Sequence, residues 1–382
     1  MSAANQFLYS GSFQPQFKTS FMGDTDINGS GDGIYTYSID DDTGELSLVH
    51  NTYGIINPAH LHADLPWKRL YAASDTNEFL NWEHGTGGGV YMFAIEESGK
   101  LTLLDKRSSC GVRAVDICGD SSGKYIIVVN EASVFYTTEF VKNNEGKYAA
   151  NIRYDEGCVV LFRVDDGCFK KVCDRYVLPQ GTPAHPSSIT IDKDNYIYIR
   201  NRGGRTINIM KLDPAAEKLI PVSSTELEGE PDGFALHPNF PIFYVSQGGS
   251  GKILIYRYNA DRTTISLVTQ VLEEEPSDPA VIIISKDGMM LYAVDRVRAE
   301  IKAYGITQDG KLVLLQRLSD AFPIKKKDSI YEAGMDQYGK WLYLSNVQEN
   351  FIHVYIVAVD GRLSRAADIP APAPTGILVP GR

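Results

Sequence analysis

The stretch GVYMFAIEESGKLTLL, residues 89–104, decides the fold of this chain. Its first seven residues are apolar and include two β-branched and two aromatic side chains, as is typical of a buried strand. The acidic, glycine-containing piece EESGK follows, and LTLL then resumes as a second short strand. The stretch therefore predicts two strands joined by a tight turn.

The same pattern occurs seven times along the chain. Most copies are followed by an acidic or glycine-containing turn and another short strand. The seven segments are GIYTYSI (33–39), GVYMFAI (89–95), CVVLFRV (158–164), TINIMKL (206–212), KILIYRY (252–258), EIKAYGI (300–306) and FIHVYIV (351–357). Internal repetition of this kind is typical of solenoids, propellers and arrays.

Two further sets of strand-like segments precede these copies. One set has an apolar run that ends at a polar residue: FLYSGS, RLYAASD, YIIVVNE, IYIRNRG, FYVSQGG, LYAVDR and LYLSNV. Before most of them lies another short piece, such as HLHADL or SSITIDK. The chain thus reads as seven units of four strands with almost no helical periodicity. We predict an all-β, seven-bladed β-propeller as a single domain over residues 1–382; tandem β-sandwiches would not repeat one four-stranded unit so evenly.

The two ends of the chain predict how the ring closes. The chain begins at the second strand of a unit, FLYSGS, and ends with PAPAPTGILVP. We therefore expect residues 375–379 to supply the missing first strand of the first blade, which removes an exposed sheet edge. Insertions at residues 11–32, 75–88 and 132–157 explain why the units are longer than a usual blade.

Composition excludes several classes of function. The net charge of −11 argues against nucleic acid or an anionic membrane as partner, because both select clustered Lys and Arg. The N-terminal residues do not form a secretory signal, and no run approaches the roughly 18 apolar residues of a membrane span. The five cysteines are odd in number and lack CxxC spacing. We expect reduced thiols in a cytoplasmic protein.

A ring of polar residues ends the second strands of six units. Its members are Ser74, Asn130, Asn201, Gln247, Asp295 and Asn346. Facing one channel, such side chains would form a small-molecule site, because buried polar groups need partners. The alternative is that they cap strands through local hydrogen bonds to the backbone.

The segment INPAHLHADLPWKRLYAASDTNEF, followed by GGGVYMFAI, resembles the lactonase family of seven-bladed propellers. That family includes bacterial 6-phosphogluconolactonase and the fungal carboxymuconate lactonizing enzyme. SSGKYIIVVNE, KDGMMLYAVDR and YGKWLYLSN are further matches, so the resemblance covers nearly the whole chain. It implies the propeller fold and a lactonase-type hydrolase or isomerase.

The resemblance is only partial at the substrate site. AHPSSI resembles the family's PHxHS segment and keeps His185, and Asp295-Arg296 retains its NR pair. However, Asp232 and Tyr331 stand where the family has arginines that meet an anionic group. Replacing a guanidinium by a carboxylate turns attraction for an anion into repulsion. With Glu131 and Glu332 nearby, this implies a small, uncharged lactone, sugar or cyclic ester.

His185 is the predicted acid–base group, because imidazole titrates near neutral pH. Arg296 would steady charge on the carbonyl oxygen, and Glu131 would act as a base or accept a substrate hydroxyl. The predicted substrate-binding residues are Asn130, Asn201, Asp232, Gln247, Asp295, Glu332 and Asn346. The alternatives are a turn histidine that bonds backbone and an Arg296 held in a salt bridge. A local basic patch, Arg200, Arg202 and Arg205, would replace the missing arginines unless its charges are simply solvated.

Two other functions are compatible with the sequence. A non-catalytic ligand-binding or scaffolding propeller would have kept the ring and lost the chemistry. A carbon–oxygen lyase or cycloisomerase would act on a different ring. In each case we expect a small-molecule partner, no organic cofactor and no contact with membrane, whereas the pattern does not predict the oligomeric state.

DTDINGSGDGIY, residues 24–35, has the oxygen spacing of a calcium loop. Asp24, Asp26, Asn28 and Asp32 would supply side-chain oxygens. Tyr35 replaces the glutamate of an EF-hand, but the stretch resembles calcium-binding hairpin loops in the propeller of integrin α-subunits, which lack that glutamate. The alternatives are a structural Ca²⁺ site and a plain polar turn.

Overall fold

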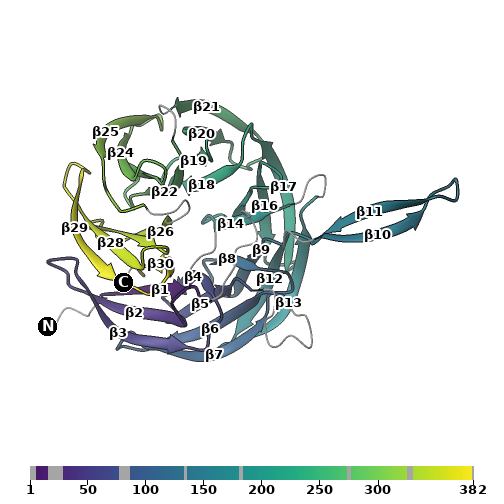
Figure 1. Ribbon diagram of the computed structural model, residues 1–382, viewed down its shortest axis with the longest axis horizontal. Coiled ribbons are helices and arrows are strands. Elements are labelled where there is room, and N and C mark those ends of the chain that lie inside the picture. Colours follow the sequence, from purple (N-terminus) through teal and green to yellow (C-terminus); the bar gives the residue numbers. More distant parts are fainter. Residues whose placement is uncertain are drawn as a thin grey trace.

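The computed structural model describes residues 6–15, 29–76, 87–132, 136–179, 184–272, 277–324 and 330–380. Seven four-stranded sheets stand around a central axis, and one two-stranded hairpin extends from the ring (Figure 1). The described residues form strands and turns and no helix. Accordingly, no helix long and apolar enough to cross a membrane occurs in this part of the chain.

The strands of each blade follow one another from the propeller axis to the periphery. Blade 1 consists of β30 (Pro374–Leu378), β1 (Gln6–Ser12), β2 (Gly33–Ile39) and β3 (Leu46–Tyr53). Blade 2 consists of β4 (Pro58–Asp64), β5 (Arg69–Ser74), β6 (Gly89–Ile95) and β7 (Leu101–Ser108). Blade 3 consists of β8 (Ala114–Gly119), β9 (Tyr125–Asn130), β12 (Cys158–Asp165) and β13 (Cys168–Val177). The hairpin strands β10 (Tyr136–Lys142) and β11 (Tyr148–Tyr154) are inserted between β9 and β12.

Blades 4 to 7 repeat the same order without such an insertion. Blade 4 consists of β14 (Pro186–Ile191), β15 (Tyr196–Asn201), β16 (Thr206–Asp213) and β17 (Lys218–Glu226). Blade 5 consists of β18 (Pro231–Leu236), β19 (Ile242–Gln247), β20 (Lys252–Tyr258) and β21 (Ile265–Leu272). Blade 6 consists of β22 (Pro279–Ile284), β23 (Met290–Asp295), β24 (Glu300–Ile306) and β25 (Leu312–Leu318). Blade 7 consists of β26 (Ile330–Met335), β27 (Trp341–Asn346), β28 (Phe351–Val357) and β29 (Leu363–Pro370).

The predicted propeller is confirmed, including its closure. The seven repeated segments of the sequence form the third strand of each blade: β2, β6, β12, β16, β20, β24 and β28. The strand expected at residues 375–379 is β30, which pairs antiparallel with β1 and sets Tyr9 opposite Leu378. The first and last strands of the chain therefore share one sheet.

The core lies between neighbouring blades. The second and third strands are buried on both faces, since each is covered by the blade on either side. The outermost strands, such as β7 and β21, consist mostly of exposed and partly buried residues. A radial stack of this kind leaves only short sheet edges exposed.

Buried tyrosines tie consecutive blades together. The hydroxyl of Tyr244 on β19 donates to the carbonyl oxygen of Gly310 at 2.8 Å, and that of Tyr292 on β23 donates to Gly361 at 3.0 Å. Each acceptor lies in the turn between the two outer strands of the next blade. Gly310 and Gly361 have φ values of +84° and +81°, where a side chain would be strained. The glycine of each turn thus serves both its own hairpin and the junction between blades.

Replacing Tyr292 by phenylalanine tests this junction. The Gly361 carbonyl would stay buried without its donor, so we expect the free energy of unfolding to fall by about 1–2 kcal/mol. Denaturant unfolding followed by tryptophan fluorescence measures the loss. Tyr53→Phe, at an exposed side chain, is the matched control and should leave the transition in place. Equal stability of Y292F and the wild type would contradict the role of this hydrogen bond.

Candidate active site

The starts of the innermost strands surround a cavity of about 480 Å³ on the propeller axis. Side chains from blades 2 to 7 line it, together with Phe13. Its polar and charged lining residues are His60, Asp75, Arg113, Glu131, Ser187, Ser188, Arg200, Arg202, Asp232, Arg296, Tyr331 and Glu332. The volume lies within the range of small-molecule sites, roughly 300–1,000 Å³.

A break in strand register at the start of each innermost strand directs these side chains inward. The pairing shifts between Pro58 and His60 in β4, between Ala114 and Asp116 in β8, and between Ile330 and Ala333 in β26. Such bulges reorient side chains and are frequent beside functional sites. In β26 the consecutive residues Tyr331 and Glu332 both line the cavity, which regular strand alternation would not allow.

Three titratable side chains from three blades meet in the cavity wall. His60 Nδ1 lies 3.0 Å from Asp116 Oδ1, and His60 Nε2 lies 3.5 Å from Glu332 Oε2. Asp116 is held in place by the backbone N–H groups of Ile117 and Ile189, at 2.7 and 2.8 Å. We refer to His60, Asp116 and Glu332 as the acid–base cluster.

Gly376 on β30 makes this contact possible. Blade 1 lies between blades 7 and 2, so Glu332 must reach His60 across the innermost strand of blade 1. A Cβ atom on Gly376 would lie 3.1 Å from both Glu332 Oε2 and His60 Cα. The neighbouring Ile377 N–H also donates to Glu332 Oε2 at 3.0 Å. Strand β30 thus leaves room for the Glu332 carboxylate at Gly376 and orients it through the Ile377 N–H.

The acid–base cluster has perturbed pKa values. Burial, with the charge of Asp116, raises the pKa of Glu332 to about 7, although His60 opposes the shift. Burial lowers the pKa of His60, but the carboxylates of Asp116 and Glu332 outweigh it and raise this pKa to about 9. At neutral pH the histidine is therefore cationic, and Glu332 lies near the midpoint of its titration.

Arg200 is the one cavity arginine without an ion pair among the described residues. Its Nε donates to Ser187 Oγ at 3.0 Å, and no carboxylate of the described chain contacts its guanidinium. Burial lowers its pKa, but an arginine side chain stays charged in proteins. Arg200 is therefore available to a carbonyl or carboxylate oxygen of a ligand.

Arg113 is shared between two carboxylates. Its Nε and Nη2 donate to Asp75 at 2.9 and 3.0 Å, and its Nη1 lies 3.0 Å from Glu131 Oε2. All three side chains are less than a tenth exposed. The φ of Arg113 is +59°, which is uncommon for a residue with a side chain. Tertiary contacts thus hold a strained backbone in order to place this cation.

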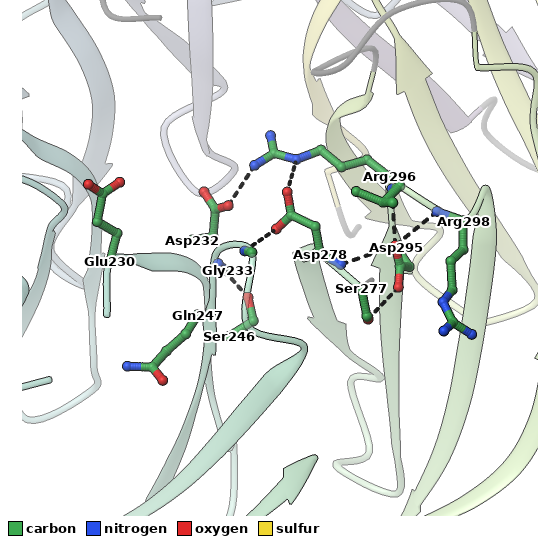
Figure 2. Close-up of polar contacts among 12 residues, drawn as sticks. Glu230, Asp232, Gly233, Ser246, Gln247, Ser277, Asp278, Asp295, Arg296 and Arg298 are labelled. Atoms are coloured by element: carbon green, nitrogen blue, oxygen red, sulfur yellow. Dashed lines mark hydrogen bonds and ion pairs between the residues drawn. The ribbon is translucent and has the colours of Figure 1, made fainter. Parts of the chain in front are cut away.

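Arg296 is shared in the same way, as Figure 2 shows. Its Nη2 lies 2.6 Å from Asp232 Oδ2, and its Nε lies 3.1 Å from Asp278 Oδ2. Burial and the charge of Asp232 raise the pKa of Asp278. Arg296 lowers this pKa, but by less. For Asp232, the arginines Arg296, Arg202 and Arg200 outweigh burial and lower the pKa. Two arginines of the cavity are thus neutralised by four carboxylates.

Tyr331 presents a hydroxyl to the cavity. Its ring packs edge-on against Phe13, with ring centroids 5.3 Å apart. Within the described residues its hydroxyl makes no hydrogen bond. Burial and the nearby carboxylates raise the pKa of Tyr331 well above its ordinary value, so the hydroxyl remains a donor.

Four of the residues predicted from sequence line this cavity: Glu131, Asp232, Arg296 and Glu332. They come from blades 3, 5, 6 and 7 and are brought together only by ring closure. His185 lies just before β14 and is buried, but its side chain is not part of the lining. Its backbone N–H donates to Asn201 Oδ1, and burial lowers its pKa.

The six ring residues predicted from the second strands are buried, and none belongs to the lining of the cavity. Each lies opposite the first residue of the innermost strand of its blade. Each bonds the segment that leads into the innermost strand of its own blade. Ser74 donates to Ile56, Asn130 bonds Ser109, and Asn201 accepts from His185. Gln247 contacts Gly229, Asp295 accepts from Ser277 and the Asp278 N–H, and Asn346 donates to Pro323. The ring therefore holds the segments that lead into the innermost strands.

The sequence analysis did not single out three lining residues, His60, Asp75 and Arg113. It also did not identify Asp116 and Asp278, which pair with His60 and Arg296. His60 stands in the segment NPAHLHAD, where it contributes to the family resemblance without standing out as a site residue. A usable signal is positional, because the third residues of β4, β8 and β26 are His60, Asp116 and Glu332. Aligning the units with one another would have picked out all three.

The predicted calcium loop is only partly described. Asp24, Asp26 and Asn28 lie outside the described residues. Asp32 Oδ1 accepts hydrogen bonds from the Tyr35 hydroxyl at 2.9 Å and from Asn51 Nδ2 at 3.0 Å. Elsewhere in the described chain, no group of three or more His, Cys, Asp or Glu side chains is placed to hold a metal ion. The Ca²⁺ site stays a prediction.

The fold and the cavity define a class: a closed propeller with acid–base side chains on its axis. Residues 19–133, 138–277 and 247–376 match the family described as "Lactonase, 7-bladed beta-propeller". The chain belongs to this lactonase family.

Individual relatives are distant. An uncharacterized protein of Staphylococcus epidermidis is 22% identical over 346 residues, 89% of this chain and 79% of that protein. The 6-phosphogluconolactonase of Enterobacter sp. strain 638 is 23% identical over 59% of this chain and 69% of its own length. The periplasmic gluconolactonase of Pseudomonas aeruginosa superposes with a TM-score of 0.77 at 16% identity, covering 98% of this chain and 100% of that one.

Replacing Arg113 by leucine tests the electrostatic framework of the cavity. Asp75 and Glu131 would be left buried without their cation, so we expect a loss of about 3–5 kcal/mol in the free energy of unfolding. Denaturant unfolding measures the loss. The exposed Lys311, paired with Asp309 at 2.7 Å, supplies the control K311L, which should unfold like the wild type. If R113L is as stable as K311L, the contacts of Arg113 with Asp75 and Glu131 do not stabilise the fold.

Proposed function

We propose that this protein is a lactonase-type hydrolase that opens a small, uncharged lactone in the axial cavity. Family membership supports the reaction class, and the acid–base cluster supports the location. The observation that carries the proposal is Glu332, a cavity carboxyl whose pKa of about 7 suits a general base at neutral pH. Cavity size supports a single-ring substrate.

In the proposed first step, ionised Glu332 accepts a proton from a water molecule, and the water oxygen attacks the lactone carbonyl carbon. The imidazolium of His60, held by Asp116, favours the ionised form of Glu332. The C–O bond of the ring then breaks, and the ring oxygen takes the proton back from Glu332. The products are a carboxylic acid and a free hydroxyl, so atoms and protons balance.

Negative charge develops on the carbonyl oxygen during attack. Arg200 and Tyr331 are two cavity donors that no carboxylate or carbonyl of the described chain engages. Donors that are oriented in advance toward a developing oxyanion lower the barrier. We therefore assign oxyanion stabilisation to Arg200 and Tyr331, and Arg296 becomes a structural cation shared by Asp232 and Asp278.

The charge balance supports an uncharged substrate. Arg113 and Arg296 are each neutralised by two carboxylates, so they offer little attraction to a phosphate group. The same carboxylates can accept hydrogen bonds from the hydroxyl groups of a sugar ring. A neutral polyhydroxylated lactone fits this wall better than a phosphorylated one. His185, which sequence reasoning favoured as the base, is better placed to support Glu131 from outside the lining.

Glu332→Gln tests the reaction and its base together. We expect wild-type protein to open glucono-δ-lactone faster than 6-phosphogluconolactone, with proton release measured in weak buffer. The glutamine variant should lose about 10²–10⁴-fold in kcat, because the amide cannot accept the proton. Glu228→Gln, at an exposed side chain, is the control. No opening of any sugar or aromatic lactone by the wild type would overturn the proposal in favour of a binding protein.

The pH dependence of kcat/KM gives an independent test. Glu332 must be ionised, so the rate should rise with pH through an apparent pKa of about 7. After subtraction of the uncatalysed rate, the profile should rise to a plateau, because Glu332 stays ionised above this pKa. His60→Gln should move the rise to higher pH, since Glu332 loses the cation that favours its ionised form. A profile flat from pH 5 to 8 would exclude Glu332 as the base.

A further inference from the structure

The hairpin of β10 and β11 stands apart from the ring. Its two strands pair only with each other, with Tyr136 opposite Tyr154 and Lys142 opposite Tyr148. Figure 1 shows the hairpin projecting outward from blade 3, beyond the outer strands of the propeller. None of its residues lines the cavity.

One face of this hairpin is apolar. Directly opposed residues point to the same side of a two-stranded sheet. The pairs Thr138 with Ile152, Phe140 with Ala150, and Lys142 with Tyr148 therefore share one face, which we name the apolar face. Phe140, Tyr148 and Ile152 are 69%, 71% and 50% exposed. The opposite face carries Glu139, paired with Arg153 at 3.1 Å.

An isolated two-stranded hairpin with two exposed aromatic side chains is an incomplete structure. Such hairpins are marginally stable in water, and exposed apolar faces usually mark contact surfaces. We propose that the apolar face is a dimerisation surface, on which a second copy of this chain packs its own apolar face in the antiparallel sense.

Charge complementarity favours a second copy. The tip of the hairpin carries Lys142, Lys147 and Glu145, which lies 3.3 Å from Lys147, so its net charge is +1. The base is followed by Asp155 and by Glu156, which pairs with Arg175 at 3.1 Å. In an antiparallel, two-fold arrangement, the basic tip of one hairpin lies beside the acidic base of the other. Residues 136–154 hold three basic and two acidic side chains, whereas the whole chain has a net charge of −11. The body of a second copy therefore also attracts the tip.

The contact area is consistent with a reversible dimer. From their exposed fractions, Phe140, Tyr148 and Ile152 offer roughly 300–400 Å² per copy. Two copies then bury about 700 Å² through these side chains alone. This area lies below the roughly 1,200 Å² at the lower limit of stable specific interfaces, so the contact is a weak and transient one. We expect association in the micromolar range.

Sedimentation velocity over a protein concentration series tests the proposal. Wild-type protein should shift from monomer to dimer, whereas Phe140→Ser combined with Tyr148→Ser should raise Kd at least about tenfold. Val141→Ser, on the opposite face, is the matched control and should dimerise like the wild type. Circular dichroism and lactone opening confirm that each variant is folded. Wild-type protein that stays monomeric at about 100 µM would overturn the proposal, as would an unchanged Kd of the double variant.

Cross-linking tests the two-fold geometry. The row of Phe140 and Ala150 lies at the centre of the apolar face, so each copy of Ala150 should meet the same row of its partner. Under mild oxidation, Ala150→Cys should give a disulfide-linked dimer, whereas Asn151→Cys on the other face should not. Lys142→Glu should weaken association, and raised salt should weaken it in the wild type. Equal cross-linking at positions 150 and 151 would reject the face-to-face arrangement.

Discussion

The pairing of β30 with β1 is the constraint on which the rest of the structure depends. It joins the two ends of the chain in one sheet, with Ser10 opposite Ile377, and so closes the ring of seven blades. Without it blade 1 would lack its innermost strand and expose the edge of β1 to solvent. The same strand brings Gly376 between blades 7 and 2, where only a residue without a side chain lets Glu332 approach His60. Closure of the fold and assembly of the acid–base cluster are therefore one event.

Burial of charge determines what the cavity can do. Taking a carboxylate out of water is costly unless a cation or several N–H donors compensate. Two arginines supply these cations: Arg113 pairs with Asp75 and Glu131, and Arg296 pairs with Asp232 and Asp278. Glu332 has less compensation, because His60 is also bound to Asp116. Burial, with the charge of Asp116, raises the pKa of Glu332 to about 7.

The propeller tolerates variation at its periphery because every blade repeats the same internal pairing. The insertion that carries β10 and β11 lies between β9 and β12, which still pair from Cys158 with Asn130 to Arg163 with Tyr125. A segment inserted there leaves the pairing of the core strands unchanged and can have an apolar face of its own. The cavity, by contrast, draws two to six residues from each of blades 2 to 7, and the buried polar residues at the ends of the second strands hold the contributing segments in place.

The sequence by itself determined the fold. Strand periodicity and glycine turns are local properties, so residues 33–39 or 300–306 indicate a strand without reference to the remainder of the chain, and the unpaired strand at each end predicts closure. It also singled out Glu131, Asp232, Arg296 and Glu332 as site residues. Only the tertiary structure decided which side chains share the cavity and in which protonation state. His60 and Glu332 are far apart along the chain, and a bulge, rather than strand alternation, sets the direction of each. A pKa depends on burial and on neighbouring charges, and both exist only once the ring has closed.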